Sequence, residues 1–373
     1  YEVTGVQTCA LPIFPFRKIE PALFSGLLDD PVLHLAIRPM GKGILLDCGR
    51  IQHLAKRVLK SLTALFISHA HMDHFMGIDT FIRGIHVSPK TADIFGPPGM
   101  ATKIAHKLAG YDWNLANESW CSFRVHDVYD DRIELSFFPG PEGFIRRKGE
   151  TRPRPDRIIY CNQHIMVESE TCDHKIPSLM YKVSELPSFQ VDEKKLLQAG
   201  MVRGDWLRTL KKHFYGKNRE NEPLRVLRRK GTDTIEELVQ YPEVLYEKIR
   251  GERKEASIGY LTDIGFTKEN REKIENLMEG VTLLVCECSF LKEDEEKARI
   301  SAHLCTSDVN ILIDRIRPAF FLPIHLSKSY IHTWERLYEE LEIPPGVTLV
   351  QLPKYLTPQP LLPCEARKIM RPA

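Results

Sequence analysis

The residues best suited to chemistry are densest between Ser68 and His74, where the chain reads Ser-His-Ala-His-Met-Asp-His. Three histidines and one aspartate fall within six residues, directly after an apolar, β-branched run typical of a buried strand. Imidazole nitrogens and carboxylate oxygens are the donors that zinc and similar divalent cations prefer. The motif therefore predicts a metal site at the end of a strand.

The spacing within the motif indicates that one loop can serve two metal ions. In an extended segment His69 and His71 point to the same side, because side chains alternate along a strand. Asp73 and His74 come where the chain turns into a predicted helix, so they can face a second direction. The alternative is a group of surface histidines without a ligand role, and so dense a cluster argues against it.

Strands and helices alternate along the rest of the chain, which indicates an α/β or α+β fold. Apolar runs of strand length and helical spacing of apolar residues give the boundaries. The expected strands cover residues 44–49, 62–68, 94–99, 132–138, 158–167, 258–262, 282–287 and 319–322, and the expected helices cover residues 53–62, 72–83, 101–108, 307–315 and 333–341.

The composition is that of a globular protein with a large core. The chain has 373 residues, of which 43% are hydrophobic and 27% charged, and its net charge is only +2. No apolar run approaches the ~18 residues that a membrane-spanning helix needs. Nine cysteines without regular spacing do not make a disulfide scaffold, so we expect reduced thiols and a cytoplasmic protein.

The chain divides into a catalytic domain and segments of different character. Residues 1–13 look like a translated sequencing adapter rather than native protein, although an ordinary N-terminus is the alternative. We expect the catalytic domain over residues 14–352, with a charged insertion at residues 184–255. The tail, residues 353–373, contains five prolines and is expected to be irregular.

The insertion contains a strongly basic stretch. Residues 203–230 hold ten Lys or Arg and three acidic residues, which leaves a charge of +7. Clustered basic residues supply most of the sequence-independent affinity for nucleic acid, and Trp206, Phe214 and Tyr215 could stack on bases. The alternative is a solvated helical face. The candidate RNA contacts are Arg203, Arg208, Lys211, Lys212, Arg225, Arg228, Arg229 and Lys230.

The Ser68–His74 motif resembles the HxHxDH signature of the metallo-β-lactamase superfamily, and the resemblance extends over about residues 43–330. It implies an α+β fold, the four-layer αβ/βα sandwich. It also implies that Asp47 supports the site without binding metal. The implied ligands are His69, His71, His174 and Asp263 for one metal, and Asp73, His74, Asp263 and His325 for the other, with Asp263 bridging.

Further segments resemble the ribonuclease Z branch of this superfamily. They include Phe-Gly-Pro-Pro-Gly at residues 95–99, the stretch from His174 to Lys182, Glu-Cys-Ser-Phe at residues 287–290 and His-Leu-Cys-Thr at residues 303–306. The resemblance implies a homodimer with two Zn²⁺ ions, with Mn²⁺ as an alternative. The implied activity is cleavage of the 3′ trailer of precursor tRNA by metal-activated hydroxide.

Three residues have implied catalytic roles. Asp73 would orient the attacking water, and His303 would protonate or stabilise the leaving 3′-oxygen. Glu287 would orient a neighbouring histidine, as carboxylates beside metal centres commonly do.

Several positions depart from the ribonuclease Z pattern and keep other functions open. Met72 and Ala70 change the metal loop, and Ser329 stands where an arginine is common. A Gly/Pro-rich hairpin typical of the tRNA-clamping arm is not evident in the insertion. The alternatives are a hydrolase of a small phosphodiester, ester or lactam, and a non-catalytic RNA-binding subunit, which would have no need of seven ligands.

Overall fold

The computed structural model describes residues 14–216, 222–230, 234–251 and 254–357. The predicted non-native segment, residues 1–13, lies outside the described residues, and so does the tail beyond residue 357. The described chain forms two compact units. The large unit comprises the residues up to Glu185 and those from Ala256 onward, and the small unit comprises Leu186–Glu255.

Eight strands form the first sheet of the large unit. They are β1 (Ile19–Leu23), β2 (Leu33–Ile37), β3 (Lys42–Leu46), β4 (Leu62–Phe66), β5 (Thr91–Gly96), β6 (Ser122–Val128), β7 (Arg132–Phe138) and β8 (Arg147–Pro153). Their order in the sheet follows their order in the chain. Strands β3 to β6 run parallel, so their carboxyl ends meet at one edge, while the outer strands pair antiparallel.

Seven strands form the second sheet. They are β9 (Ile158–Cys161), β10 (Ile165–Asp173), β11 (Pro177–Glu185), β14 (Ser257–Leu261), β15 (Leu283–Glu287), β16 (Phe320–Ile324) and β17 (Thr348–Leu349). Their spatial order is β17-β16-β15-β14-β11-β10-β9. Strands β14 to β17 run parallel, and the others pair antiparallel. Each sheet therefore has a parallel part whose strand ends can carry site residues.

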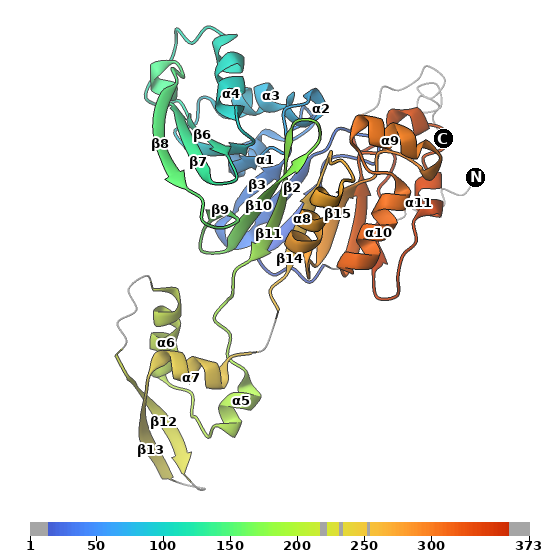
Figure 1. The fold of residues 1–373 in the computed structure, drawn as a ribbon. Helices are drawn as coiled ribbons and strands as arrows, with labels where there is room; N and C mark the ends of the chain where they lie inside the picture. The colour runs from blue at the N-terminus through green and yellow to red at the C-terminus, as the bar shows by residue number, and fades with distance from the viewer. Residues whose placement is uncertain (1–13, 217–221, 231–233, 252–253, 358–373) are drawn as a thin grey trace, which may run out of the picture. The chain divides into compact units, whose positions relative to one another are not determined.

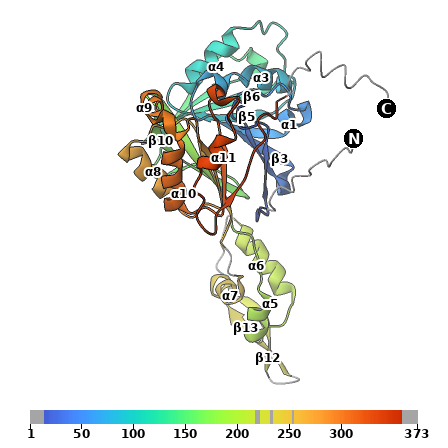
Figure 2. The ribbon, with the colours of Figure 1, turned by 90° about the vertical axis from the view of Figure 1, so that its right-hand side faces the viewer.

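Helices lie over the outer faces of the two sheets (Figures 1 and 2). Helices α1 (Lys56–Ser61), α2 (Met72–Phe75), α3 (Ile78–Ile85) and α4 (Met100–Ala109) lie over the first sheet, and α8 (Lys268–Met278), α9 (Glu295–Ser301), α10 (Thr306–Ile316) and α11 (Arg336–Glu340) lie on the side of the second. Short 3₁₀ helices are η1 (Arg38–Met40), η2 (Gly140–Glu142), η3 (Lys292–Asp294) and η4 (Lys328–Tyr330). No helix in the described ranges is long and apolar enough to cross a membrane.

Alternating side chains build the cores between these layers. Ile44 and Leu46 of β3 belong to the core that also holds Tyr181 and Tyr260 of the second sheet. Leu45, between them in the chain, belongs to a separate core with helices α1 to α4. This period of two is what a strand buried on both faces requires, and it generates the helix–sheet–sheet–helix layering.

The predicted helix over residues 72–83 is wrong, because two helices, α2 and α3, meet at Gly77. The Gly77 amide donates to the Cys48 carbonyl at 2.9 Å. A Cβ at Gly77 would lie 2.2 Å from the Gly49 carbonyl oxygen, so no larger residue fits this close approach without a shift. The tight crossing ties the end of the metal loop to the turn after β3.

The predicted single strand over residues 158–167 is also wrong, because it forms β9, a turn and the start of β10. The Asn162 side chain accepts from the amides of His164 and Ile165 at 2.8 and 3.0 Å, which closes the turn. The connection before it contains β8, an edge strand whose side chains are all exposed. Its polar sequence carries no apolar alternation that could have indicated a strand.

The small unit has its own elements and core. It contains α5 (Glu193–Gln198), α6 (Asp205–Tyr215), β12 (Leu224–Lys230), β13 (Thr234–Gln240) and α7 (Pro242–Ile249). The antiparallel pair β12–β13 is a hairpin that the sequence did not indicate. The core residues are Leu196, Met201, Trp206, Leu210, Val226, Leu245 and Ile249.

The small unit interrupts the large one between two neighbouring strands. Ser184 of β11 is paired with Ser257 of β14, and the Glu185 amide donates to the Ala256 carbonyl at 2.9 Å. The chain therefore leaves and re-enters the second sheet at adjacent positions.

Candidate metal centre

Strand ends from both sheets supply the candidate ligands. His69 follows β4 of the first sheet, while Asp263 and His325 follow β14 and β16 of the second. His174 lies in the short turn between β10 and β11. Because carboxyl ends of parallel strands meet at one edge of a sheet, residues far apart in sequence are brought together here.

His69, His71, His174 and Asp263 form the first cluster, with one ligand atom of each within 4.8 Å of the others. Asp263 Oδ2 lies 3.5 Å from His69 Nε2 and 3.7 Å from His174 Nε2. His71 is exposed, whereas the other three residues are buried. The cluster is the same set that the sequence resemblance implies for one metal.

Asp73, His74 and His325 form the second cluster. Asp73 Oδ2 lies 3.1 Å from His325 Nε2. Asp263 lies against this cluster too, with Oδ2 3.2 Å from His74 Nε2 and Oδ1 3.1 Å from His325 Nδ1. All seven residues implied as ligands therefore come together, and Asp263 faces both groups.

The rings of His74 and His174 are held at Nδ1 and present Nε2 to the carboxylate of Asp263. Nδ1 of His74 lies 2.8 Å from Asp47 Oδ2, and Nδ1 of His174 donates to the Ala302 carbonyl at 2.7 Å. A neutral ring that donates through Nδ1 keeps its lone pair on Nε2. Metal-ligating histidines are oriented in this way, by a hydrogen bond on the nitrogen that does not bind the ion.

Buried atoms without partners support a cation at this place. Nε2 of His69 and Nε2 of His74 are buried and form no hydrogen bond within the described part of the chain. Asp263 Oδ1 is also buried without a hydrogen bond, although it lies 3.1 Å from His325 Nδ1. Unsatisfied buried polar atoms are costly, and a divalent cation bound among them would remove that cost. The nitrogen and oxygen donor set fits zinc.

Asp47 is the centre of a buried hydrogen-bond network behind the ligands. Its carboxylate accepts from the Ser68 amide and hydroxyl at 2.7 and 2.9 Å. It also accepts from the hydroxyls of Tyr260 and Thr262, at 3.0 and 3.2 Å, besides lying against His74. Tyr260 and Thr262 were not candidates from the sequence. The position of Thr262 directly before Asp263 is the only sequence signal that could have suggested a role for it.

A second buried carboxylate, Glu287, holds the other side of the centre. Glu287 Oε2 lies 2.8 Å from His303 Nδ1 and accepts from the Ser289 hydroxyl at 2.6 Å. Its Oε1 accepts from the Ile264 amide at 2.6 Å, directly after Asp263 in the chain. His303 Nδ1 also lies 3.8 Å from Asp263 Oδ1. Ser289, which sequence reasoning missed, thus connects to the histidine implied as catalytic.

The backbone is strained where it presents these side chains. Asp47, Asp263 and His325 have φ angles of 55°, 49° and 61°, in the left-handed region that non-glycine residues rarely adopt. Lys175 and Ala302, beside His174, have φ angles of 61° and 57°. Such conformations persist only when the surrounding structure enforces them, and they concentrate at functional sites.

The pKa values of the ligands follow from burial and from their neighbours. Burial, together with the charge of His74, lowers the pKa of His69 to about 2, so this ring stays neutral. Burial lowers the pKa of His325 as well, but Asp263 outweighs it and raises the pKa to about 10. Asp263 likewise raises the pKa of His74. Without a cation, Asp263 thus favours the protonated forms of His74 and His325, and metal binding to these rings would release their protons.

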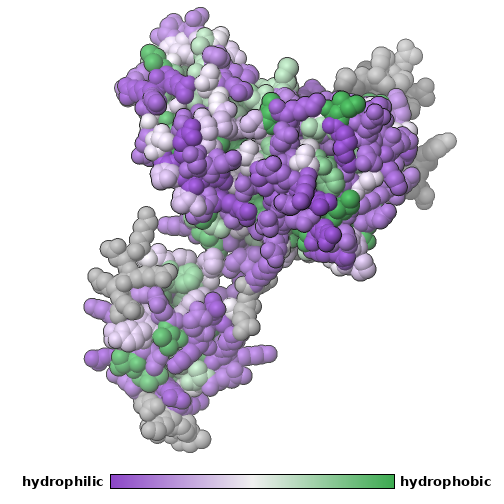
Figure 3. All heavy atoms as spheres, viewed as in Figure 1, coloured by the Kyte–Doolittle hydropathy of each residue, from purple (hydrophilic) through white to green (hydrophobic). Residues whose placement is uncertain are grey.

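The candidate RNA contacts lie in the small unit. The side chains of Arg203, Arg208, Lys211, Lys212, Arg225, Arg228 and Arg229 are exposed. Lys230 ends β12, and its side chain lies outside the described part. Hydrophilic residues dominate the face of the molecule in Figure 3. The basic residues are therefore available to a ligand, without a fixed site like that of the metal cluster.

The predicted base-stacking role of Trp206 is wrong, because its side chain belongs to the core of the small unit. Its indole Nε1 donates to the Val202 carbonyl at 2.9 Å. Phe214 is half-buried, and Tyr215 is 50% exposed. These two aromatic residues remain accessible.

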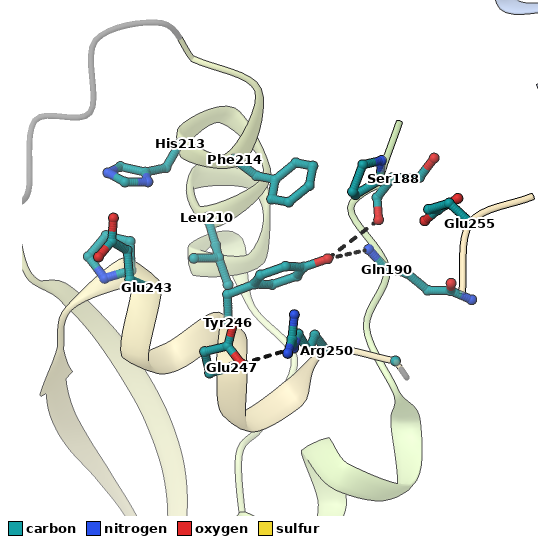
Figure 4. Close-up of a pocket in the computed structure, with 13 residues that line it drawn as sticks. Ser188, Gln190, Leu210, His213, Phe214, Glu243, Tyr246, Glu247, Arg250 and Glu255 are labelled. Atoms are coloured by element: carbon teal, nitrogen blue, oxygen red, sulfur yellow. Dashed lines mark hydrogen bonds and ion pairs between the residues drawn. The ribbon is translucent and has the colours of Figure 1, made fainter. Parts of the chain in front are cut away.

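A cavity of about 540 Å³ lies in the small unit. Leu210 and Phe214 of α6 and Tyr246 of α7 form its apolar wall (Figure 4). The Tyr246 hydroxyl accepts from the Gln190 amide at 3.1 Å and donates to the Ser188 carbonyl at 3.4 Å, so this ring is fixed in place.

Comparison with known proteins extends the similarity over most of the chain. No family model matches the chain. A ribonuclease Z of Deinococcus radiodurans is 29% identical over 323 residues, 83% of this chain and 91% of the relative. A ribonuclease Z of Brevibacillus brevis is 27% identical over 273 residues, 70% of this chain and 69% of that protein.

A solved structure supports the fold. The metallo-β-lactamase fold protein YhfI from Bacillus subtilis matches 89% of this chain and 98% of its own, with a TM-score of 0.50 and 11% identity. The predicted α+β sandwich is thereby confirmed. The chain has the metallo-β-lactamase fold and is ribonuclease Z-like over most of its length.

Proposed function

We propose that the protein is a metal-dependent hydrolase, a ribonuclease Z-like endonuclease that cleaves the 3′ trailer of precursor tRNA. The observation that carries this function is the convergence of six ligand side chains around a seventh, Asp263, with buried Nε2 atoms of His69 and His74 that form no hydrogen bond in the described part of the chain. The similarity to ribonuclease Z over 83% of the chain supports the substrate.

Two divalent cations, Zn²⁺ or alternatively Mn²⁺, would complete the active site. His69, His71, His174 and Asp263 would hold one, and Asp73, His74, Asp263 and His325 would hold the other. When bound, the cations supply Lewis acidity, which lowers the pKa of water and neutralises charge on phosphate. The donor set favours zinc, because imidazole outnumbers carboxylate.

The chain's own residues orient water and move protons. The side chain of Asp73 is 40% exposed and is fixed by His325, so one carboxylate oxygen can orient an attacking water. Burial lowers the pKa of His303, but Glu287 outweighs it, and the net shift is upward. This upward shift increases the share of protonated His303, the form that can donate a proton to the leaving 3′-oxygen. Glu287 acts through this ring as a positioning residue.

The small unit supplies contacts to RNA in this proposal. Its exposed basic residues on α6 and β12 can neutralise phosphates, and Phe214 and Tyr215 can stack on unpaired bases. We further propose a cytoplasmic homodimer. The homodimer is what the sequence resemblance implies, and the seven described cysteines, none of them in a disulfide, suit a reducing compartment.

Cleavage of a 3′-extended precursor tRNA, with a small phosphodiester in parallel, tests this function. Wild-type protein should cut the RNA near the discriminator base, and Asp73→Ala should abolish the cut. Turnover of the small phosphodiester alone would favour the alternative, a hydrolase of small substrates. Activity that persists in Asp73→Ala would contradict the proposed site.

Charge reversal tests the RNA contacts separately. Lys211→Glu with Lys212→Glu removes two exposed charges from α6, and we expect KM for RNA to rise about tenfold, with a weaker salt dependence of binding. Turnover of the small phosphodiester should not change. Lys56→Glu with Arg57→Glu, an exposed basic pair on α1 of the large unit, is the matched control. An equal loss in both double variants would show that the effect is general.

A further inference from the structure

A cavity of about 230 Å³ opens beside the second cluster of ligands. Asp73, His303 and His325 line one side of it. Its other wall is formed by residues 28–30, which belong to the loop between β1 and β2. A substrate that enters this cavity to reach Asp73 and His303 would therefore lie against this loop.

The loop is fixed between the metal centre and a segment near the far end of the chain. The Leu27 carbonyl accepts from the Leu326 amide at 2.9 Å, directly after the ligand His325. On the opposite side, the amides of Leu27 and Leu28 donate to the carbonyls of Pro353 and Lys354 at 2.9 and 3.0 Å. Residues 353–357 thus lie along the loop although they have no regular secondary structure.

Asp29 locks the two segments together. Its buried carboxylate accepts from the amides of Leu356 and Thr357 at 2.7 and 3.0 Å, and from the Thr357 hydroxyl. It also accepts from the Gly26 amide at 2.8 Å. A Cβ at Gly26 would lie 2.6 Å from Tyr355 Cα, so the segments are in tight contact. Burial raises the pKa of Asp29, but these hydrogen bonds outweigh it and keep the carboxyl ionised.

We propose that residues 353–357 form a clasp that positions the substrate-facing wall of the active site, with Thr357 as its positioning residue. This inference rests on the proposed function, because the wall matters only if substrate enters the cavity. The clasp connects to the metal centre in three steps. Thr357 donates a hydrogen bond to Asp29, the Leu27 carbonyl of the same loop accepts from the Leu326 amide, and Leu326 directly follows the ligand His325 in the chain.

The clasp sets the place of a charged pair at the cavity. Asp30 Oδ1 lies 3.1 Å from Lys328 Nζ, and both residues line the cavity. Asp30 also packs on the backbone of the turn after β3, where a Cβ at Gly49 would lie 2.7 Å from Asp30 Cβ. The carbonyl oxygen of Asp73 also lies against Gly49, where a Cβ would be 2.2 Å from it. A loosened loop would therefore move the Asp30–Lys328 pair relative to Asp73. We therefore expect a loosened loop to weaken substrate binding without displacing the metal ligands.

Thr357→Val in the full chain tests the clasp, because valine keeps the shape and removes the hydroxyl. We expect KM for the precursor tRNA to rise about five- to tenfold, with kcat within about twofold and zinc content unchanged. Thr357→Ser, which retains the hydroxyl, should restore KM. Thr348→Val is the matched control, since this exposed threonine lies in β17 away from the loop.

Amide hydrogen exchange gives a readout that does not depend on activity. Peptides covering residues 25–30 and 326–328 should exchange faster in Thr357→Val than in Thr357→Ser or wild type. An unchanged KM and unchanged exchange would overturn the clasp, as would a lower thermal midpoint with an unchanged KM. If the wild type cleaves neither RNA nor the small phosphodiester, the proposed function fails, and the exchange comparison alone decides on the clasp.

Discussion

The metal centre and the basic surface of the small unit are built on opposite principles. In the metal centre most functional side chains are buried, and carboxylates or carbonyls behind them fix their direction. In the small unit the candidate RNA contacts are exposed, and the ion pairs of Arg203 and Arg225 lie at the surface. Chemistry at one atom needs fixed geometry, whereas attraction of a phosphate chain needs charge at roughly the right place.

The largest expected effect comes from removing the carboxylate shared by both clusters. Asp263→Ala should lower kcat/KM at least about 1000-fold for RNA and for the small phosphodiester alike, since it removes a ligand of both cations. Metal content measured by mass spectrometry should fall in parallel. Retention of two metal equivalents and of activity would show that the buried cluster is not the catalytic centre.

Deletion of the small unit should separate the contribution of the basic surface to RNA binding from the chemistry of the metal centre. Because Glu185 and Ala256 are paired across β11 and β14, residues 186–255 can be replaced by an Asn-Gly turn. We expect kcat/KM for precursor tRNA to fall about 100-fold as phosphate contacts are lost, with turnover of the small phosphodiester within about twofold. An equal loss on both substrates would contradict the division of labour. Circular dichroism would check that the large unit still folds.

A smaller effect is expected from the support network of the metal centre. Asp47→Asn keeps the size of the side chain but removes the charge that orients His74 and gathers the hydroxyls around it. Zinc affinity and activity should fall about 10- to 100-fold, as for other carboxylates behind metal ligands. Competition with a chromogenic chelator measures the affinity. Asp79→Asn, at a partly exposed acid on α3, is the control.

The smallest effect concerns stability and its dependence on pH. Asp29→Asn should lower the free energy of unfolding by about 1–2 kcal/mol at pH 7, because an amide nitrogen cannot accept the hydrogen bonds of a carboxylate. The pKa of Asp29 is lowered in the folded protein, so its stabilisation is present above 3.8 and is lost as pH falls through the folded value. Urea unfolding of chelator-treated protein at pH 7, 5 and 3.5 should show a difference that shrinks only at the lowest pH. A difference independent of pH would contradict this account.

The sequence could indicate ligands because histidine and aspartate are residue types that bind metal ions. The motif from His69 to His74 is dense enough to predict a metal site by itself, whereas Asp263 and His325 are weak candidates singly and were implied by the family resemblance. The supporting residues Tyr260 and Ser289 could not be found in this way. Tyr260 bonds to Asp47 across the two sheets, and Ser289 bonds to Glu287, whose own role beside His303 appears only in the folded chain. A tyrosine in an apolar strand carries no local sign that its hydroxyl reaches a distant carboxylate.

Fold prediction failed where local pattern and tertiary context disagree. The helical periodicity of residues 72–83 is real, but Gly77 crosses Cys48 and Gly49 too closely for one continuous helix. Trp206 lies among basic residues in sequence, yet the small unit needs it as core. The hairpin β12–β13 was missed because Val226 is the one buried residue among the exposed arginines of β12 in the described part of this strand, so no apolar alternation is visible.

The ligand set begins at His69 and is complete only with His325, which follows one of the last strands of the second sheet. During synthesis, a nascent chain could present the metal loop long before the shared aspartate or the final histidine has left the ribosome. The first ligand set, His69, His71, His174 and Asp263, is complete once β14 has been made, whereas the second set still lacks His325. Chains stalled before β16 would therefore be able to complete only the first of the two metal sites.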